Sequence, residues 1–135
     1  MGKVNKSNKL LYRMEVLLDS SFIISCVKKK IDFISELEGM GFKILLPKEV
    51  FEEIKDLSLH SARETRVACI IALEMFERKK TKNVTLGDRR TPDEGLIEMG
   101  KKGAYIATLD AVIKKSVPNK VVISDSTKGL IVERS

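Results

Sequence analysis

The chain alternates short apolar runs with longer amphipathic segments, and this pattern restricts the fold more than any other feature of the sequence. Runs of three to five largely apolar residues, the length of buried strands, occur at 15–18, 43–46, 83–86, 104–108 and 121–123. Segments with helical spacing, and no hairpin signals, lie between them. This alternation predicts βαβ units and a parallel sheet covered on both faces. We therefore expect a three-layer α/β/α fold around a central five-stranded parallel sheet.

The segments between the runs carry helix signals. Helical spacing is found at 20–39, in two pieces, and at 47–59, 62–76, 91–102 and 111–115. The clearest start is Thr91-Pro92, because a capping residue followed by proline at the first helical position is typical of a helix N-terminus.

The chain length supports a single domain, since 135 residues fall within the usual size of one. Residues 1–13 hold four basic residues and no acid, so we expect a basic, flexible tail. The domain is expected at 14–126, followed by a C-terminal extension at 127–135.

Net charge, apolar run length and cysteine usage restrict where in the cell we expect the protein. Lysine and arginine total 25 against 19 acidic residues, a net charge of +6, of which four units belong to the tail. The longest apolar run, 67–73, is far shorter than the roughly 18 residues of a membrane span, so we expect no membrane contact. Cys26 and Cys69 lie among apolar neighbours without metal-site spacing, which favours reduced thiols and a cytoplasmic location.

Acidic residues follow the predicted strands. Asp19 comes directly after the first run and Asp110 directly after the fourth. Ligands of open α/β sheets bind beyond the carboxyl ends of the strands, where these two residues are expected. Helical phase then favours Glu53 over Glu52, and Asp93 over Glu94, as the acids beside the buried faces of their helices.

Four carboxylates that converge repel one another unless a cation lies between them. Hard divalent ions prefer such oxygen ligands, so Asp19, Glu53, Asp93 and Asp110 predict a site for Mg²⁺ or Mn²⁺. A bound ion of this kind activates water and offsets the charge that develops on a phosphate.

The order of these motifs resembles the PIN-domain ribonucleases. The residues that carry the resemblance are Leu17-Leu18-Asp19-Ser20-Ser21-Phe22, Leu46-Pro47 to Ile54, Asp93-Glu94-Gly95-Leu96-Ile97 and Ile106-Ala107-Thr108-Leu109-Asp110. The resemblance implies strand order 3-2-1-4-5 and a metal-dependent phosphodiesterase centre. It matches the four acids to the family's acidic positions, and Ser21 and Thr108 to its polar neighbours. The segment around Asp93 looks closer to the small rRNA-processing type than to toxins.

We therefore hypothesise a metal-dependent endoribonuclease in which Asp19, Asp93 and Asp110 hold the ion and Glu53 is a ligand directly or through water. The expected contacts to the RNA backbone are basic residues, namely Lys79, Lys80, Lys82, Arg89 and Arg90. A homodimer or a protein partner is possible on this interpretation.

Other functions remain open. The same fold suits a non-catalytic RNA-binding scaffold of a ribonucleoprotein particle, or the toxin of a toxin-antitoxin pair. A phosphatase-like enzyme with Asp19 as nucleophile is disfavoured, because Ser21 stands where a second aspartate is usual. His60 is the only histidine, so a Ser-His-Asp mechanism is disfavoured as well.

Overall fold

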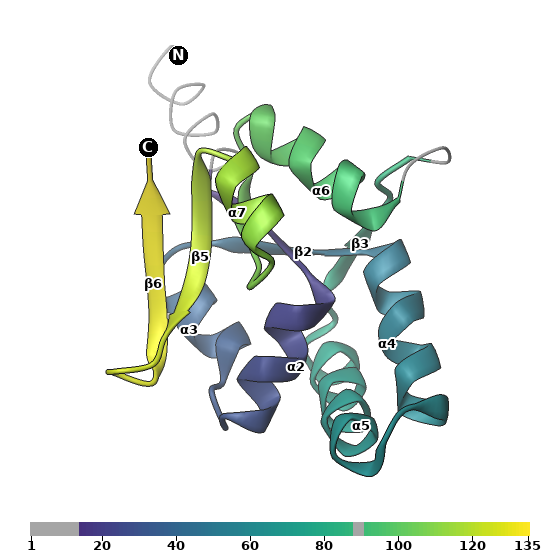
Figure 1. Cartoon of the computed structure of the whole chain (residues 1–135). Helices are drawn as coiled ribbons and strands as arrows, with labels where there is room; N and C mark the ends of the chain where they lie inside the picture. The colour runs from purple at the N-terminus through teal and green to yellow at the C-terminus, as the bar shows by residue number, and fades with distance from the viewer. Residues whose placement is uncertain (1–13, 88–90) are drawn as a thin grey trace.

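The structure, a computed structural model, describes residues 14–87 and 91–135. Within these residues a six-stranded sheet lies between two layers of helices (Figure 1). The strands are β1 (Glu15–Leu18), β2 (Lys43–Pro47), β3 (Lys82–Val84), β4 (Tyr105–Ala107), β5 (Asn119–Ser124) and β6 (Gly129–Arg134). The helices are α2 (Ser20–Lys28), α3 (Phe33–Gly39), α4 (Lys48–His60), α5 (Arg63–Lys79), α6 (Pro92–Lys101) and α7 (Ala111–Ser116).

The strand order is β3-β2-β1-β4-β5-β6, and the first five strands in the chain pair in parallel. The predicted three-layer fold and the order 3-2-1-4-5 are therefore confirmed. β6 is an addition, because it pairs antiparallel with β5 along its whole length. A turn that contains Lys128 in the left-handed conformation, with φ 54°, connects the two strands. The residues expected only as a C-terminal extension thus continue the sheet.

Alternate residues of each central strand enter two different cores. Val16 and Leu18 of β1 pack in the larger core, with α2, α3, α4 and α5. Leu17 points to the other face and packs in a smaller core with residues of α6 and α7, including Leu96 and Ile113. Both faces of β1 are therefore buried, which explains why its sequence is continuously apolar instead of alternating.

Side-chain caps fix the starts of four helices. Asp19 caps α2, Asp32 caps α3, Thr91 caps α6 and Asp110 caps α7, in each case by accepting a hydrogen bond from a backbone N–H of the first turn. The cap at Asp32 separates α2 from α3, so the helical region after β1 is in two pieces, as expected. Asp19 and Asp110 are therefore held at fixed points beyond the ends of β1 and β4.

Among the described residues, no helix is long and apolar enough to cross a membrane. Both cysteines are buried as free thiols. Burial raises the pKa of Cys26 to about 12, and burial also raises the pKa of Cys69. Thiols of this kind are weak nucleophiles, which gives Cys26 and Cys69 a packing role.

Candidate active site

A hollow of about 570 Å³ lies beyond the carboxyl ends of β1 and β4. Its lining includes carboxylates and hydroxyl groups but no lysine, arginine or histidine from the described residues. The lining residues are Asp19, Ser20, Ser21, Glu49, Glu52, Glu53, Thr91, Pro92, Asp93 and Asp110. The first turns of α2, α4 and α6 and the N-cap of α7 border this hollow, and the positive ends of helix dipoles favour acidic side chains there.

Asp19 is the most restrained of these acids. Its side chain is 6% exposed, and Oδ1 accepts a hydrogen bond of 2.9 Å from the backbone N–H of Ser20. Oδ2 accepts one of 2.7 Å from the hydroxyl of Thr108 and one of 3.2 Å from the hydroxyl of Ser21. Two hydroxyl groups from different parts of the chain therefore orient this carboxylate.

Thr108 connects Asp19 to Asp110. Its side chain is fully buried, and its Oγ1 accepts a 3.0 Å hydrogen bond from the backbone N–H of Asp110 while it donates to Asp19. The hydroxyl of Ser21 similarly accepts a 3.4 Å bond from the N–H of Leu109. Oδ1 of Asp110 accepts the capping bonds from Val112 and Ile113, at 2.8 and 3.0 Å. This network joins the ends of β1 and β4.

Asp93 differs from the two capping aspartates. It lies in the first turn of α6, it is exposed, and it makes no hydrogen bond with the described residues. Partial burial raises the pKa of its carboxyl group, and the negative charges of Asp19 and Asp110 add to the rise. Asp93 lines the hollow and Glu94 does not. Its charge is thus destabilised by the two carboxylates across the hollow.

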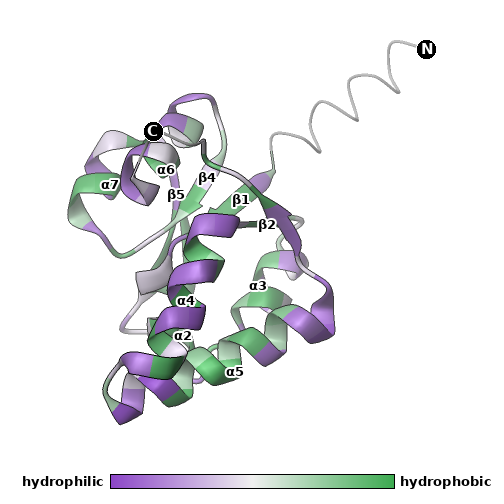
Figure 2. Cartoon of the chain, turned by 90° about the vertical axis from the view of Figure 1, so that its right-hand side faces the viewer, coloured by the Kyte–Doolittle hydropathy of each residue, from purple (hydrophilic) through white to green (hydrophobic). Residues whose placement is uncertain are grey.

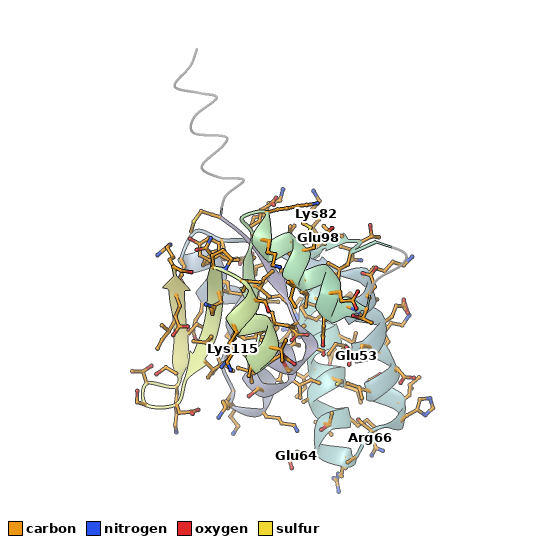
Figure 3. All side chains as sticks on the ribbon, turned by 45° about the horizontal axis from the view of Figure 1, so that its top comes forward. Glu53, Glu64, Arg66, Lys82, Glu98 and Lys115 are labelled. Carbon is orange, nitrogen blue, oxygen red and sulfur yellow. The ribbon has the colours of Figure 1, made fainter. Side chains whose placement is uncertain are left out.

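The acids of α4 show two features that the sequence did not predict. Glu52 and Glu53 both border the hollow and both are exposed, so helical phase does not separate them (Figure 3 labels Glu53). Glu49 also lines the hollow. Both of its carboxylate oxygens accept a hydrogen bond from the backbone N–H of Leu86, each at 3.2 Å. Glu49 therefore ties the first turn of α4 to the backbone of Leu86, just after β3.

None of the lysines predicted to bind RNA lines the hollow. Lys79 ends α5, Lys80 is its C-cap and Lys82 begins β3, which places all three at the amino end of that strand. Lys82 and Glu53 lie well apart in Figure 3. Arg89 and Arg90 lie outside the described residues.

The donors of the hollow fit a hard divalent cation by their chemistry, since carboxylate oxygens are the ligands that Mg²⁺ and Mn²⁺ prefer. Among residues 14–87 and 91–135, no three acidic, histidine or cysteine side chains are close enough to hold an ion as they stand. Asp93 has no hydrogen bond to a described residue that would prevent its carboxylate from turning toward Asp19 and Asp110. Three of these side chains would therefore hold one ion together only after some of them move closer.

The fold and the hollow define a class: an α/β/α domain whose parallel sheet presents an acidic site beyond its central strands. Comparison with protein families makes this specific, because the family described as "PIN like domain" matches residues 16–124. The chain belongs to this family. Among solved structures, the PIN domain endonuclease Utp24 is similar at a TM-score of 0.70 and 20% identity, over 90% of this chain and 92% of that one. This likeness shows a shared fold. None of the curated proteins matches the sequence.

Proposed function

We propose that the protein is a metal-dependent endoribonuclease that hydrolyses phosphodiester bonds at the acidic hollow. The observation that carries the proposal is the set of six carboxylates, from the end of β1 and from α4, α6 and α7, that line one hollow without a basic side chain among its described residues. Such a set binds a hard cation far better than it binds a phosphate directly. The similar fold of an endonuclease and membership of the PIN-like family support the assignment.

In this proposal Asp19, Asp93 and Asp110 hold Mg²⁺ or Mn²⁺, and Glu53 is a further ligand, directly or through water. When bound, the cation lowers the pKa of a water molecule and offsets charge on the phosphodiester. The hydroxyls of Thr108 and Ser21 position Asp19, and Thr108 also fixes the backbone at Asp110. The protein's own side chains therefore orient the proposed metal ligands and supply their negative charge.

RNA is the proposed substrate, and it extends beyond the hollow. The amino end of β3 carries Lys79, Lys80 and Lys82, all of them exposed. We propose that these lysines, with Arg89 and Arg90, contact backbone phosphates at a distance from the bond that is cut. An exposed cation contributes mainly non-specific, salt-dependent affinity, which suits this position.

The test compares Asp19→Asn with Asp32→Asn on a circular single-stranded RNA in Mn²⁺, since only an endonuclease opens a circle. Both residues are aspartate N-caps, and asparagine caps a helix as well as aspartate does. Both variants are therefore expected to fold, whereas only Asp19 lines the hollow. We expect Asp19→Asn to lose more than about 100-fold in cleavage rate, because even outer-shell residues of metal sites are worth about 10–100-fold. Asp32→Asn is expected to cut like the parent.

Two results contradict the proposal. One is a folded parent protein that leaves the circle intact with either ion while binding it, which is the behaviour of a non-catalytic RNA-binding scaffold. The other is a folded Asp19→Asn variant that cuts as fast as the parent, which places the chemistry elsewhere.

A further inference from the structure

The exposed face of α5 is apolar at its centre. Val67 and Ile70 are each 45% exposed and Ile71 is 42% exposed. The opposite side of the helix is buried in the domain, through Ala68, Cys69, Ala72 and Phe76. Figure 2 shows hydrophobic and hydrophilic residues alternating along this helix at the bottom of the view. Three neighbouring large aliphatic side chains on one helix face form a contiguous patch of the kind that marks an interaction surface.

The charges on either side of this patch are separated by sign. Arg63 and Arg66 lie on its N-terminal side, and Glu74 and Glu77 lie on its C-terminal side. All four are exposed, and none forms a salt bridge with a described residue. This order opposes the helix dipole, which favours acids near the N-terminus and bases near the C-terminus. Glu64 in the first turn and Arg78 and Lys79 in the last turn follow the dipole instead. The four flanking charges have no salt-bridge partner among the described residues and are available to a second chain.

The pattern is self-complementary about Ile70. Arg66 and Glu74 are each four residues from Ile70, and Arg63 and Glu77 are each seven residues from it. Residues seven apart lie on one stripe of a helix, because seven residues make nearly two turns. A second α5 that runs antiparallel, related by a two-fold axis at Ile70, brings basic residues of each copy opposite acidic residues of the other.

We propose that α5 is the interface of a homodimer in which two copies of this chain pair through antiparallel α5 helices. Val67, Ile70 and Ile71 of the two copies form the apolar centre. Arg66 lies opposite the partner's Glu74 and Arg63 opposite the partner's Glu77, and each pair occurs twice because the interface is isologous.

The groove beside α5 extends this surface. It has a volume of about 640 Å³ and lies between α2 and α5, lined by residues that include Val27, Val67 and Ile71. Its charged residues are Lys28, Arg63 and Glu64, at the N-terminal end of the patch, and Figure 3 labels Glu64 and Arg66 at this same end of α5. No residue of α5 or of this groove lines the acidic hollow, so the dimer leaves both hollows accessible.

The test uses charge reversal, with sedimentation velocity of the full chain at about 100 µM as the measurement. The parent is expected to dimerise with a dissociation constant on the order of 10 µM, as for a small interface. Arg66→Glu alone and Glu74→Arg alone each turn two attractive pairs into repulsive ones, so each is expected to weaken dimerisation at least about tenfold. An equimolar mixture of the two variants restores both pairs in a heterodimer and is expected to dimerise like the parent. Glu38→Arg, an exposed reversal on α3, is the matched control and is expected to dimerise normally.

Each outcome decides the question, because the two variants are compared with their own mixture and need only be folded by circular dichroism. A parent that stays monomeric at about 100 µM overturns the proposal. A parent dimer that persists in both single variants, or a mixture that stays monomeric, shows that the copies do not pair antiparallel through α5. The hollow has no part in this experiment, so its result is independent of the RNA-cleavage test.

Discussion

At the scale of single residues, the hydroxyl of Thr108 links Asp19 to the backbone of Asp110 in the candidate site. It donates to Oδ2 of Asp19 and accepts from the N–H of Asp110 inside a fully buried position. Thr108→Val keeps the shape but leaves that N–H without its acceptor. We expect the free energy of unfolding in urea to fall by about 1–3 kcal/mol, the cost of a buried unsatisfied group. Cleavage of RNA is expected to fall by about 10–100-fold, as for other groups that orient a metal ligand.

Two matched substitutions test whether the loss of the Thr108 hydroxyl causes these effects. Thr108→Ser retains the hydroxyl and is expected to keep most of the cleavage activity. Thr85→Val, an exposed threonine with no hydrogen bond to a described residue, is expected to change neither quantity. A Thr108→Val protein as stable and active as the parent contradicts the role of this hydroxyl.

At the scale of elements, close contact between α6 and the residues around α7 sets where Asp93 lies. A Cβ at Gly100 would meet the side chain of Val117, with Cβ at 2.8 Å and Cγ1 closer still. Val117 is β-branched and cannot turn away easily. We expect Gly100→Ala to lower the free energy of unfolding by about 1–3 kcal/mol, the usual cost of overpacking.

Gly39 is the matched control, since a Cβ there meets nothing within 4 Å. Gly39→Ala removes a flexible residue from the end of α3, so it is expected to be neutral or to stabilise the protein by up to about 1 kcal/mol. Equal effects of the two alanines in urea titrations would mean that α6 has room to move.

The C-terminal end of α5 and the start of β3 carry three exposed lysines. Replacing Lys79, Lys80 and Lys82 together with alanine is expected to reduce the slope of log K against log salt for single-stranded RNA by about 2, since each phosphate contact contributes about 0.7. Fluorescence anisotropy at several salt concentrations measures this slope. The control removes the same charge at the start of β2 and the end of α6, through Lys43, Lys101 and Lys102. Identical slopes for the two triple variants would exclude a specific role for the β3 end.

The fold was predictable from the sequence where its signals are local. A buried strand followed by Asp19, or Thr91 before Pro92, needs only a few adjacent residues to define it. β6 was not predicted, because Gly129–Arg134 is a short segment with two charged residues, and its pairing with β5 depends on the long-range register. The turn at 125–128 also contains neither glycine nor asparagine, the residues that usually indicate a hairpin turn.

The candidate site was predictable only in part for a similar reason. Asp19 and Asp110 follow strands directly, so their place at the sheet edge follows from the alternation. Glu49 was missed because its partner, the N–H of Leu86, is 37 residues away in the chain. Helical phase favoured Glu53 over Glu52, yet α4 meets the hollow with its first turns, where both residues have access.

At the scale of the whole molecule, positive and negative charge are separated. The net charge is +6, yet the hollow is lined by six carboxylates, and four helix N-termini border them. The dipoles of these helices offset part of the repulsion among the acids. They do not remove it, because the pKa of Asp93 is still raised by burial and by Asp19 and Asp110. The molecule thus keeps a charge that weakens its own fold, which is typical of functional sites.

The raised pKa of Asp93 predicts how the stability of the protein depends on pH. The pKa of Asp93 is higher in the folded protein than in the unfolded chain. Its contribution to folding stability is therefore complete below the ordinary carboxyl pKa, and it is lost as the pH rises through the raised pKa of the folded state. Asp93→Asn removes the charge. We expect the variant to melt at a higher temperature than the parent at neutral pH, and the difference to disappear near pH 3, where both side chains are neutral. Thermal unfolding without divalent ions measures both, with Glu38→Gln as the exposed control.

Adding Mn²⁺ at neutral pH should reverse the order of the two proteins. An ion that binds only the folded state raises stability in proportion to the logarithm of its concentration, and the parent offers it one more carboxylate than Asp93→Asn does. The parent is therefore expected to gain more in melting temperature than the variant, whereas Glu38→Gln gains as much as the parent. Equal gains for parent and Asp93→Asn would place the ion away from Asp93. The loss of stability at neutral pH would then be unconnected with metal binding, and the assignment of Asp93 as a ligand would be wrong.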